Sequence, residues 1–437
     1  MIYILFIYFS NFIRNVIWLI VSGRLLKEKN QSSELKINSF NEKLYIIIPL
    51  LYEKNIVLST LDSFYSIIVK KSNYNLVFVT TSKEVDDITT NDILSTELKK
   101  HNYDRVFLYN FPSDKGVMAH QINYAIKKIK EVEKGNFWIC IYNADSRISE
   151  KTFFEFENIY KKNINYKNYC IQQYSYYEMF CGKHIINSCV MWQNRWSILF
   201  EYSRAIYQNI FVKKMKKFKY FSLLNIIFGK MNYVIGHGLF ISNEVLESVG
   251  GFPEDTINED AFLGFKLNVN DIKIIPMGIL EKAEFTNRIS VYLKQQNVWF
   301  NGPFDAWKYY KIEKSQRKLK FFEKFEMMIY ALKLFLHAIY WLVSPITMVL
   351  VLPSSIMLKY GYEYMITYLL FVWLYLDGIN YWVYSFLNKR GYNLLCDFYS
   401  FGIIAYFLHG VGAVINIIQR LRGKNSIMNK YKTERNR

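Results

Sequence analysis

The sequence lacks the regular Cys and His spacings of zinc-binding and disulfide-rich domains. Its cysteines are five in number and irregularly placed: Cys140, Cys170, Cys181, Cys189 and Cys396. We therefore expect buried thiols in a reducing compartment and no structural disulfide. The chain also lacks a recognisable nucleic-acid-binding motif, so its net charge of +18 does not make nucleic acid an expected partner.

Charged residues are scarce as well, at 21% of the chain against about 25% in an average soluble protein. Hydrophobic residues make up 51% and aromatic residues 18%, and both ends are richer in them than residues 30–320. The basic excess gathers beside these apolar ends, as the positive-inside rule and attraction to anionic lipids predict. The basic clusters are at residues 24–29, 213–219, 308–324 and 420–437. The composition therefore indicates a membrane protein with membrane lipids as partners.

Four apolar stretches are long enough to cross a bilayer, which takes about 20 residues. The first, residues 2–22, has neither the basic start nor the small-residue cleavage site of a secretory signal. Asn11 and Arg14 interrupt it, so a helix lying on the membrane surface is the alternative. The other three stretches cover residues 327–351, 365–387 and 398–418.

The topology contains a conflict. Basic residues after the first stretch predict a cytosolic central domain at the cell (inner) membrane. Four spans then put the basic tail, residues 421–437, outside, which the positive-inside rule disfavours. The alternative is that residues 398–418, where His409 lies near glycines, do not fully cross. Four spans are the expectation, with residues 306–326 and 218–230 along the headgroups.

The central region alternates short apolar runs with amphipathic stretches. The runs LYIIIPL, NLVFVTT, DRVFLYN and NFWICIYNAD are typical of buried strands in a parallel sheet. Residues 57–70 and 117–130 are expected to form intervening helices. This alternation predicts an α/β domain whose ligand crevice lies at the carboxyl ends of the strands.

Polar motifs follow these strands at positions where a sheet does not itself need them. They are Pro49–Glu53, Asn143–Asp145, Asn258–Asp260 after Gly250–Pro253, and Gln295–Trp299 followed by Gly302. In this order they resemble family 2 glycosyltransferases, especially the membrane-integrated branch of cellulose, chitin and hyaluronan synthases. Those enzymes show a proline-and-acid turn, D-x-D, G-G-F with an E-D pair, and Q-x-x-R-W. The stretch from Lys115 to Asn123 is similar to their G-K-x-x-A-x-N helix start.

The resemblance covers residues 40–305 and implies a cytosolic GT-A-type (Rossmann-like) domain with a mixed sheet. The remaining boundaries follow: residues 1–24 form an N-terminal transmembrane helix, 306–326 a basic interfacial segment, 327–420 the C-terminal transmembrane helices, and 421–437 a basic tail. The implied reaction is an inverting sugar transfer from a nucleotide-sugar donor, with UDP as the nucleotide.

The same resemblance assigns the reacting groups. Asp260 is the expected base for the acceptor hydroxyl and Glu259 its neighbour, because an acceptor needs a base within hydrogen-bond reach. Asp145 is the expected ligand of Mg²⁺ or Mn²⁺, a hard cation that neutralises the diphosphate leaving group. Asn143 replaces the first acid of the D-x-D motif. The alternatives are an acidic helix start capped by Asn258 and a simple Asn–Asp turn.

Binding residues are assigned with more departures from the family pattern. Trp299 offers a face for a sugar ring, and Gln295 lies one helical turn earlier; a core tryptophan is the alternative. Val298 stands where the family has the arginine that holds the diphosphate, and Lys294 or Arg288 is a candidate replacement. The remaining expected contacts are the nucleotide contacts Tyr52, Glu53, Glu84, Lys115 and Asn143, and the sugar or acceptor contact His237 between two glycines.

Three functions fit these residues. The preferred one transfers sugar, from a UDP-sugar, to a growing polysaccharide at the membrane. The second is a single transfer to a lipid-linked (polyprenyl-phosphate) acceptor, which stays open because the F-x-V-T-x-K gating loop of processive synthases is absent. The third is a catalytically weakened scaffold subunit, suggested by Asn143 and Val298.

Overall fold

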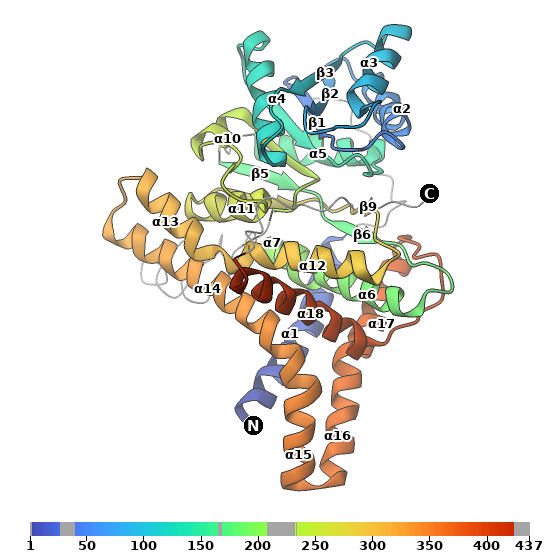
Figure 1. The fold of residues 1–437 in the computed structure, drawn as a ribbon, viewed down its shortest axis with the longest axis vertical. Coiled ribbons are helices and arrows are strands. Elements are labelled where there is room, and N and C mark those ends of the chain that lie inside the picture. Colours follow the sequence, from blue (N-terminus) through green and yellow to red (C-terminus); the bar gives the residue numbers. More distant parts are fainter. Residues whose placement is uncertain (1, 27–39, 165–167, 208–231, 233, 424–437) are drawn as a thin grey trace. The chain divides into compact units, whose positions relative to one another are not determined.

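The computed structural model describes residues 2–26, 40–164, 168–207, 232 and 234–423. These residues form two compact units (Figure 1). The first unit contains residues 2–26, 175–207 and 284–423, and the second contains residues 40–164, 168–174, 232 and 234–283. The predicted headgroup segment 218–230 and the tail beyond residue 423 lie outside the described residues.

The second unit is built on a seven-stranded sheet of order β3-β2-β1-β4-β7-β5-β8. Strand β7 runs antiparallel to β4 and β5, while the other neighbours are parallel. The strands are β1 Lys43–Pro49, β2 Tyr74–Thr81, β3 Val106–Phe111, β4 Phe137–Ile141, β5 Tyr169–Gln172, β7 Leu239–Ser242 and β8 Lys273–Pro276; β9 Glu281–Ala283 follows. The mixed α/β sheet that the sequence predicts is therefore confirmed.

Helices cover both faces of this sheet, which explains why its central strands read as continuous apolar runs. One face packs on Leu61 and Phe156, from α2 (Val57–Ile68) and α5 (Glu150–Asn163). The other packs on Ile122 of α4 (Met118–Val132), Leu246 of α10 (Asn243–Ser248) and Leu263 of α11 (Glu259–Val269). Helix α3 is Thr90–Lys100, opened by a capping box between Thr89 and Asp92.

The first unit is helical apart from β6, Ser175–Tyr177. Its helices up to residue 207 are α1 Ile2–Leu25, α6 His184–Trp196, η1 Ser197–Tyr202 and α7 Ser203–Tyr207. Those after them are α12 Ile289–Phe304, α13 Ala306–Gln316, α14 Phe321–Ile346, η4 Thr347–Val351, α15 Leu352–Tyr360, α16 Tyr362–Trp373, η5 Leu374–Gly378, α17 Ile379–Lys389 and α18 Gly402–Leu421. The π-helical segments η4 and η5 join α14 to α15 and α16 to α17 into longer rods (Figure 1).

Within the described part of the chain, four helices are long and apolar enough to cross a membrane. They are Tyr3–Gly23, Phe321–Tyr360, Tyr362–Lys389 and Gly402–Leu421, and they coincide with the four stretches that the sequence predicts. Arg390, after α17, donates to the backbone carbonyls of Gly23 (2.5 Å) and Leu26 (3.1 Å). The C-terminal ends of α1 and α17 therefore lie together, as expected if both end on the same side of the membrane.

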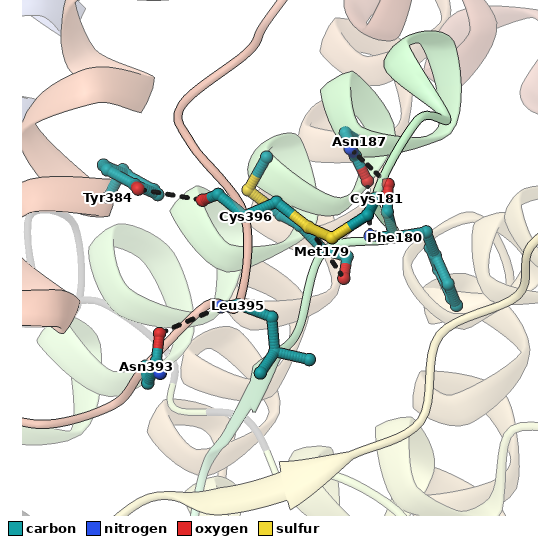
Figure 2. Close-up of a disulfide and its surroundings, with 8 residues drawn as sticks. All are labelled: Met179, Phe180, Cys181, Asn187, Tyr384, Asn393, Leu395 and Cys396. Atoms are coloured by element: carbon teal, nitrogen blue, oxygen red, sulfur yellow. Dashed lines mark hydrogen bonds between the residues drawn. A yellow bond between two sulfur atoms is a disulfide. The ribbon is translucent and has the colours of Figure 1, made fainter.

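The prediction of no structural disulfide is wrong for the structure, which shows the oxidised chain. Cys181, before α6, is joined to Cys396, before α18, with their Cα atoms 5.7 Å apart (Figure 2). The two residues are 215 positions apart, so their spacing in the sequence carried no sign of the pairing. Cys140, Cys170 and Cys189 are buried free thiols, and burial raises the pKa of each.

The structure also divides residues 40–305 differently from the predicted domain. Residues 175–207 and 284–305 group with the apolar helices of the first unit. The reason is visible in α6, where ten of thirteen residues, from Ile186 to Arg195, are buried. Helix α12 belongs to the same unit and buries its own residues Gln296, Asn297 and Asn301.

Candidate functional site

The turn after β1 is fixed by a buried carboxylate. Tyr52 has a left-handed backbone (φ 55°), and its N–H donates to Oε1 of Glu84 at 2.5 Å. The other oxygen of Glu84 accepts from the N–H of Thr90 at 2.6 Å, at the start of α3. Glu84 is 8% exposed, so its carboxylate positions Tyr52 and α3. A direct contact between Glu84 and a nucleotide stays a prediction.

One side chain connects the carboxyl ends of β1 and β2 beside this turn. Gln121, on α4, donates from its side-chain nitrogen to the carbonyls of Leu50 and Val79, both at 2.9 Å. Glu53 is anchored by its N–H, which donates to the Thr90 hydroxyl at 3.0 Å. These bonds leave the side chains of Tyr52 and Glu53 half-buried at the carboxyl edge of the sheet, where the sequence places the nucleotide.

The Asn143–Asp145 turn closes β4. The N–H of Asn143 donates to the Ser146 hydroxyl (3.2 Å), and its carbonyl accepts from the Ser146 N–H (3.1 Å). The carbonyl of Ala144 accepts from the Thr60 hydroxyl at 2.5 Å, which ties the turn to α2. The turn is thus fixed through its backbone, and the side chains of Asn143 and Asp145 are half-buried.

The segment around His237 packs against the backbone of Gln173. Gly238 adopts φ 68°, and a Cβ there would lie 2.6 Å from the carbonyl oxygen of Gln173, so only glycine fits. His237 Nδ1 lies 2.9 Å from Oε2 of Glu281, whose side chain is fully buried. The imidazole is therefore oriented by a carboxylate that solvent does not reach. No motif in the sequence pointed to Glu281.

The same segment meets the acidic pair at the start of α11. A Cβ at Gly236 would lie 3.5 Å from Oδ2 of Asp260 and 3.9 Å from Oε1 of Glu259. Asp260 is half-buried and its Oδ1 accepts from the N–H of Ala261 at 2.7 Å, while Glu259 is 2% exposed. The structure thus brings together two motifs that are more than 20 positions apart, the His237 segment and the predicted base.

Two side chains form hydrogen bonds with the backbone of the glycine-rich turn before α11. Asn123 of α4 accepts from the N–H of Phe252 (3.1 Å) and donates to its carbonyl (2.9 Å). Lys266, 5% exposed, donates to the carbonyl of Val249 at 2.8 Å. The predicted similarity around Asn123 therefore has a structural use, because this side chain positions the turn that leads to Asp260. Lys115 is exposed in the loop before α4.

Gln295 and Trp299 belong to the first unit, on α12, whereas the other candidate residues belong to the second. The predicted helix is confirmed, and it places Gln295 and Trp299 one turn apart on one face. Trp299 is 37% exposed, so it is no core tryptophan, and Val298 is half-buried.

Sequence reasoning missed the opposite face of α12. A Cβ at Gly412 would lie 2.3 Å from Cβ of Gln296, so α18 packs here at backbone distance. Gln296 Oε1 lies 2.7 Å from Nδ1 of His409, and Nδ2 of Asn416 donates to Oδ1 of Asn297 at 2.8 Å. The only available signal was the amide pair inside the motif, whose partners follow more than 110 residues later.

Metal binding is limited by the donor set. Among the described residues, no group of three or more His, Cys, Asp or Glu side chains could hold an ion. Mg²⁺ and Mn²⁺ sites in nucleotide enzymes use one or two carboxylates together with substrate phosphates. Asp145 fits that arrangement as the single carboxylate of its turn, with the donor diphosphate supplying the other oxygens.

Comparison with known proteins identifies the class. Residues 138–387, more than half of the chain, match the family described as glycosyl transferase family group 2. The chain belongs to this family, and its mixed sheet is a GT-A-like glycosyltransferase fold. The protein is accordingly a family 2 glycosyltransferase.

Individual relatives are more distant. The chain is 30% identical over 99 residues to the beta-monoglucosyldiacylglycerol synthase of Synechocystis sp., a match covering 21% of this chain and 20% of that protein. A mannosyltransferase of Pyrobaculum calidifontis, in complex with GDP-Man and Mn²⁺, is 13% identical with a TM-score of 0.48, over 90% of this chain and 97% of that one. S. aureus TarS 1–349 is 13% identical with a TM-score of 0.41, over 88% and 93%.

Proposed function

We propose that this glycosyltransferase moves a sugar from a nucleotide-sugar donor to an acceptor at the membrane, with inversion at the anomeric carbon. The observation that carries the proposal is the meeting of Gly236 with Asp260 and Glu259, since a Cβ at Gly236 would touch both carboxylates. Because Gly236 has no side chain, the backbone of this segment lies close beside the proposed base.

Asp260 is the proposed base. In this reaction the acceptor oxygen attacks the anomeric carbon, its proton passes to the Asp260 carboxylate, and the bond from the anomeric carbon to the diphosphate breaks. The nucleoside diphosphate leaves with the bonding electrons. Asp260 is half-buried with one oxygen bound to the Ala261 N–H, which orients the other oxygen, Oδ2, toward the Gly236 segment.

Tyr52, Glu53, Lys115 and Asn143 are the proposed donor contacts, with UDP as the nucleotide. A divalent ion, Mg²⁺ or Mn²⁺, supplies charge neutralisation for the departing diphosphate when bound. Asp145 would hold it through a carboxylate on a turn that the backbone has already fixed. His237, held by Glu281, is the proposed sugar or acceptor contact.

The proposed acceptor is a growing polysaccharide that contacts Trp299 and Gln295. The proposed location of the catalytic domain is the cytosol. A second candidate, single transfer to a lipid-linked acceptor, is favoured by a cavity in the first unit that three arginines line. The short match to a relative named for synthesising a glucosyl diacylglycerol is in keeping with it.

The test uses full-length protein in detergent with a panel of UDP- and GDP-sugars. Release of nucleoside diphosphate identifies the donor, and the size of the product separates a polymer from a single addition. The proposal expects release that needs both a sugar donor and a membrane-lipid extract or glycan primer. Absence of release with every donor, in protein that still binds nucleotide, would reject it.

A further inference from the structure

A cavity of about 80 Å³ lies inside the first unit, among α1, α6, η1, α7, α14, η5 and α18. One enclosed water needs about 10–15 Å³, so the cavity has room for a group of several heavy atoms. Arg14, Arg195 and Arg204 line it together with aromatic side chains. Its lining, taken over the described residues, contains no Asp or Glu.

Arg195 on α6 is the most enclosed of these cations, at 5% exposed. Its Nη1 donates to the backbone carbonyl of Tyr375 at 2.6 Å, and its guanidinium lies 5.0 Å from the ring of Trp192 and 4.7 Å from that of Tyr375. A backbone carbonyl and two rings compensate part of a buried charge but do not neutralise it. Burial accordingly lowers the pKa of Arg195.

Arg14 faces the same cavity from α1. It lies in the middle of the apolar helix Tyr3–Gly23, yet within the described part of the chain it makes no ion pair or hydrogen bond. Two nearby carboxylates do not line the cavity: Glu201 accepts from the indole of Trp196 (3.1 Å), and Asp377 from the N–H of Gly402 (2.7 Å). An arginine within a membrane-spanning helix is costly and usually functional.

Two nitrogen atoms of other lining residues have no hydrogen-bond partner within the described chain. The indole Nε1 of Trp192 and Nε2 of His337 are buried, and neither has a hydrogen-bond partner among the described residues. Buried polar atoms without a partner are rare in proteins, because each loses its bonds to water. The arginines and the Trp192 indole N–H around one small cavity match a ligand that offers several negatively charged oxygens.

We propose that this cavity binds the phosphate group of a membrane lipid, and that this lipid carries or is the acceptor. The second half rests on the proposed glycosyltransferase function. The lipid source is favoured over free phosphate because Ile13 (43% exposed) and Ile17 (52% exposed) flank Arg14 on an apolar helix. An acyl or prenyl chain attached to the phosphate has apolar side chains to lie along at this point.

The test measures binding of radiolabelled farnesyl phosphate to full-length protein in an uncharged detergent, with farnesol and inorganic phosphate as competitors. Farnesyl phosphate is expected to compete at least tenfold better than either, because only it offers both the anion and the apolar chain. Arg14→Gln is expected to weaken binding tenfold or more, and Arg14→Lys less. The matched control Arg422→Gln removes an exposed arginine of the same chain and is expected to bind as the wild type does.

Three outcomes would overturn the proposal. Equal competition by farnesol would show that the cavity ignores the anion, and equal competition by inorganic phosphate would make it a site for the free ion. Equal loss in Arg14→Gln and Arg422→Gln would show that only overall charge matters. If Arg14→Gln does not fold, Trp192→Phe removes the unpartnered indole N–H, keeps an aromatic ring at this position and is expected to weaken binding threefold or more.

A separate activity measurement distinguishes failure of the lipid site from failure of the proposed transferase function. Donor-dependent release of nucleoside diphosphate by the wild-type protein is measured without the lipid probe. Its absence with every donor would reject the transferase role while the Arg14-dependent binding result stands. Binding without dependence on Arg14, together with normal release, would reject only the lipid site.

Discussion

Asn416 on α18 donates from Nδ2 to Oδ1 of Asn301 on α12 at 2.9 Å. One turn further along, Nη2 of Arg420 pairs with Oδ1 of Asp305 at 2.9 Å, and the Arg420 guanidinium also bonds Asn301. The C-terminal half of α18 is thus fastened to α12 by polar side chains. A helix crossing the bilayer at this point would have to hold these amides and the Arg420–Asp305 ion pair at membrane depth, which is costly.

This packing predicts that α18 does not carry the chain across the membrane. The tail after residue 423 would then be cytosolic, which removes the conflict with its basic residues. With the native cysteines replaced, Lys430→Cys in intact cells is expected to resist an impermeant thiol reagent until the membrane is permeabilised. Lys359→Cys, exposed at the far end of α15, is the matched control and is expected to react without permeabilisation. Reaction of Lys430→Cys in intact cells would restore the four-span topology.

Asp260→Asn tests the proposed base. With an acceptor hydroxyl, the variant is expected to lower turnover by about 10²–10⁴-fold, the usual contribution of a general base. Donor binding, measured by calorimetry with the nucleotide, is expected to change little. Asp255→Asn, an exposed carboxylate shortly before α11, is the control and is expected to retain turnover. An Asp260→Asn enzyme within a few-fold of wild type on a hydroxyl acceptor would remove Asp260 from this role.

The same variant separates the two acceptor classes. A phosphate monoester has a second pKa of about 6, so at neutral pH its oxygen is already ionised and needs no base. If the lipid phosphate itself is the nucleophile, Asp260→Asn is expected to lower turnover less than tenfold with that acceptor. A loss of 10²-fold or more, in the range of about 10²–10⁴ typical of a general base, would show that the phosphate only anchors an acceptor hydroxyl.

The strands and the motif order could be predicted from sequence because they are local. LYIIIPL and NLVFVTT are continuous apolar runs, and both became fully paired neighbours, β1 and β2. The turns after them carry polar residues that a sheet does not need. The α12 helix was likewise predicted from its motif, and Trp299 proved exposed as a binding residue must be.

What could not be predicted depends on partners distant in the chain. Glu281 orients His237 from 44 positions away, and Gln296 meets His409 from 113 positions away. In the sequence Arg14 is an interruption of an apolar span, and only the packing of α1 beside η1, α7 and α14 shows that it lines a cavity. Such pairings follow from packing, which no short window of sequence contains.

Metal dependence is tested at the turn after β4. A chelator is expected to abolish activity, and Mg²⁺ or Mn²⁺ to restore it. Asp145→Ala is not expected to recover at ordinary metal concentrations, because it removes the one carboxylate of the turn. Asn143→Asp adds a second carboxylate and is expected to lower the metal concentration that gives half-maximal activity. Full activity of the wild type in chelator would reject the metal site.

The oxidation state of the Cys181–Cys396 pair tests both the packing of the first unit and the compartment in which these loops lie. The N–H of Met179 donates to the carbonyl of Leu394 (3.2 Å), so the two loops also meet through their backbones. The Tyr384 hydroxyl of α17 donates to the carbonyl of Cys396 (2.9 Å; Figure 2). Purified protein kept in air is expected to show three alkylated thiols after denaturation and five after reduction.

Protein alkylated inside cells is expected to show five modified thiols, since cytosolic glutathione keeps such pairs reduced. Three modified thiols in cells would place these loops in an oxidising compartment and contradict the cytosolic assignment. In the air-oxidised protein, Cys181→Ser is expected to lose about 2–4 kcal/mol of unfolding free energy. The double variant Cys181→Ser/Cys396→Ser should lose no more than either single one, because a bridge is removed only once. Additive losses in thermal denaturation would show that the two thiols act separately and that no bridge forms.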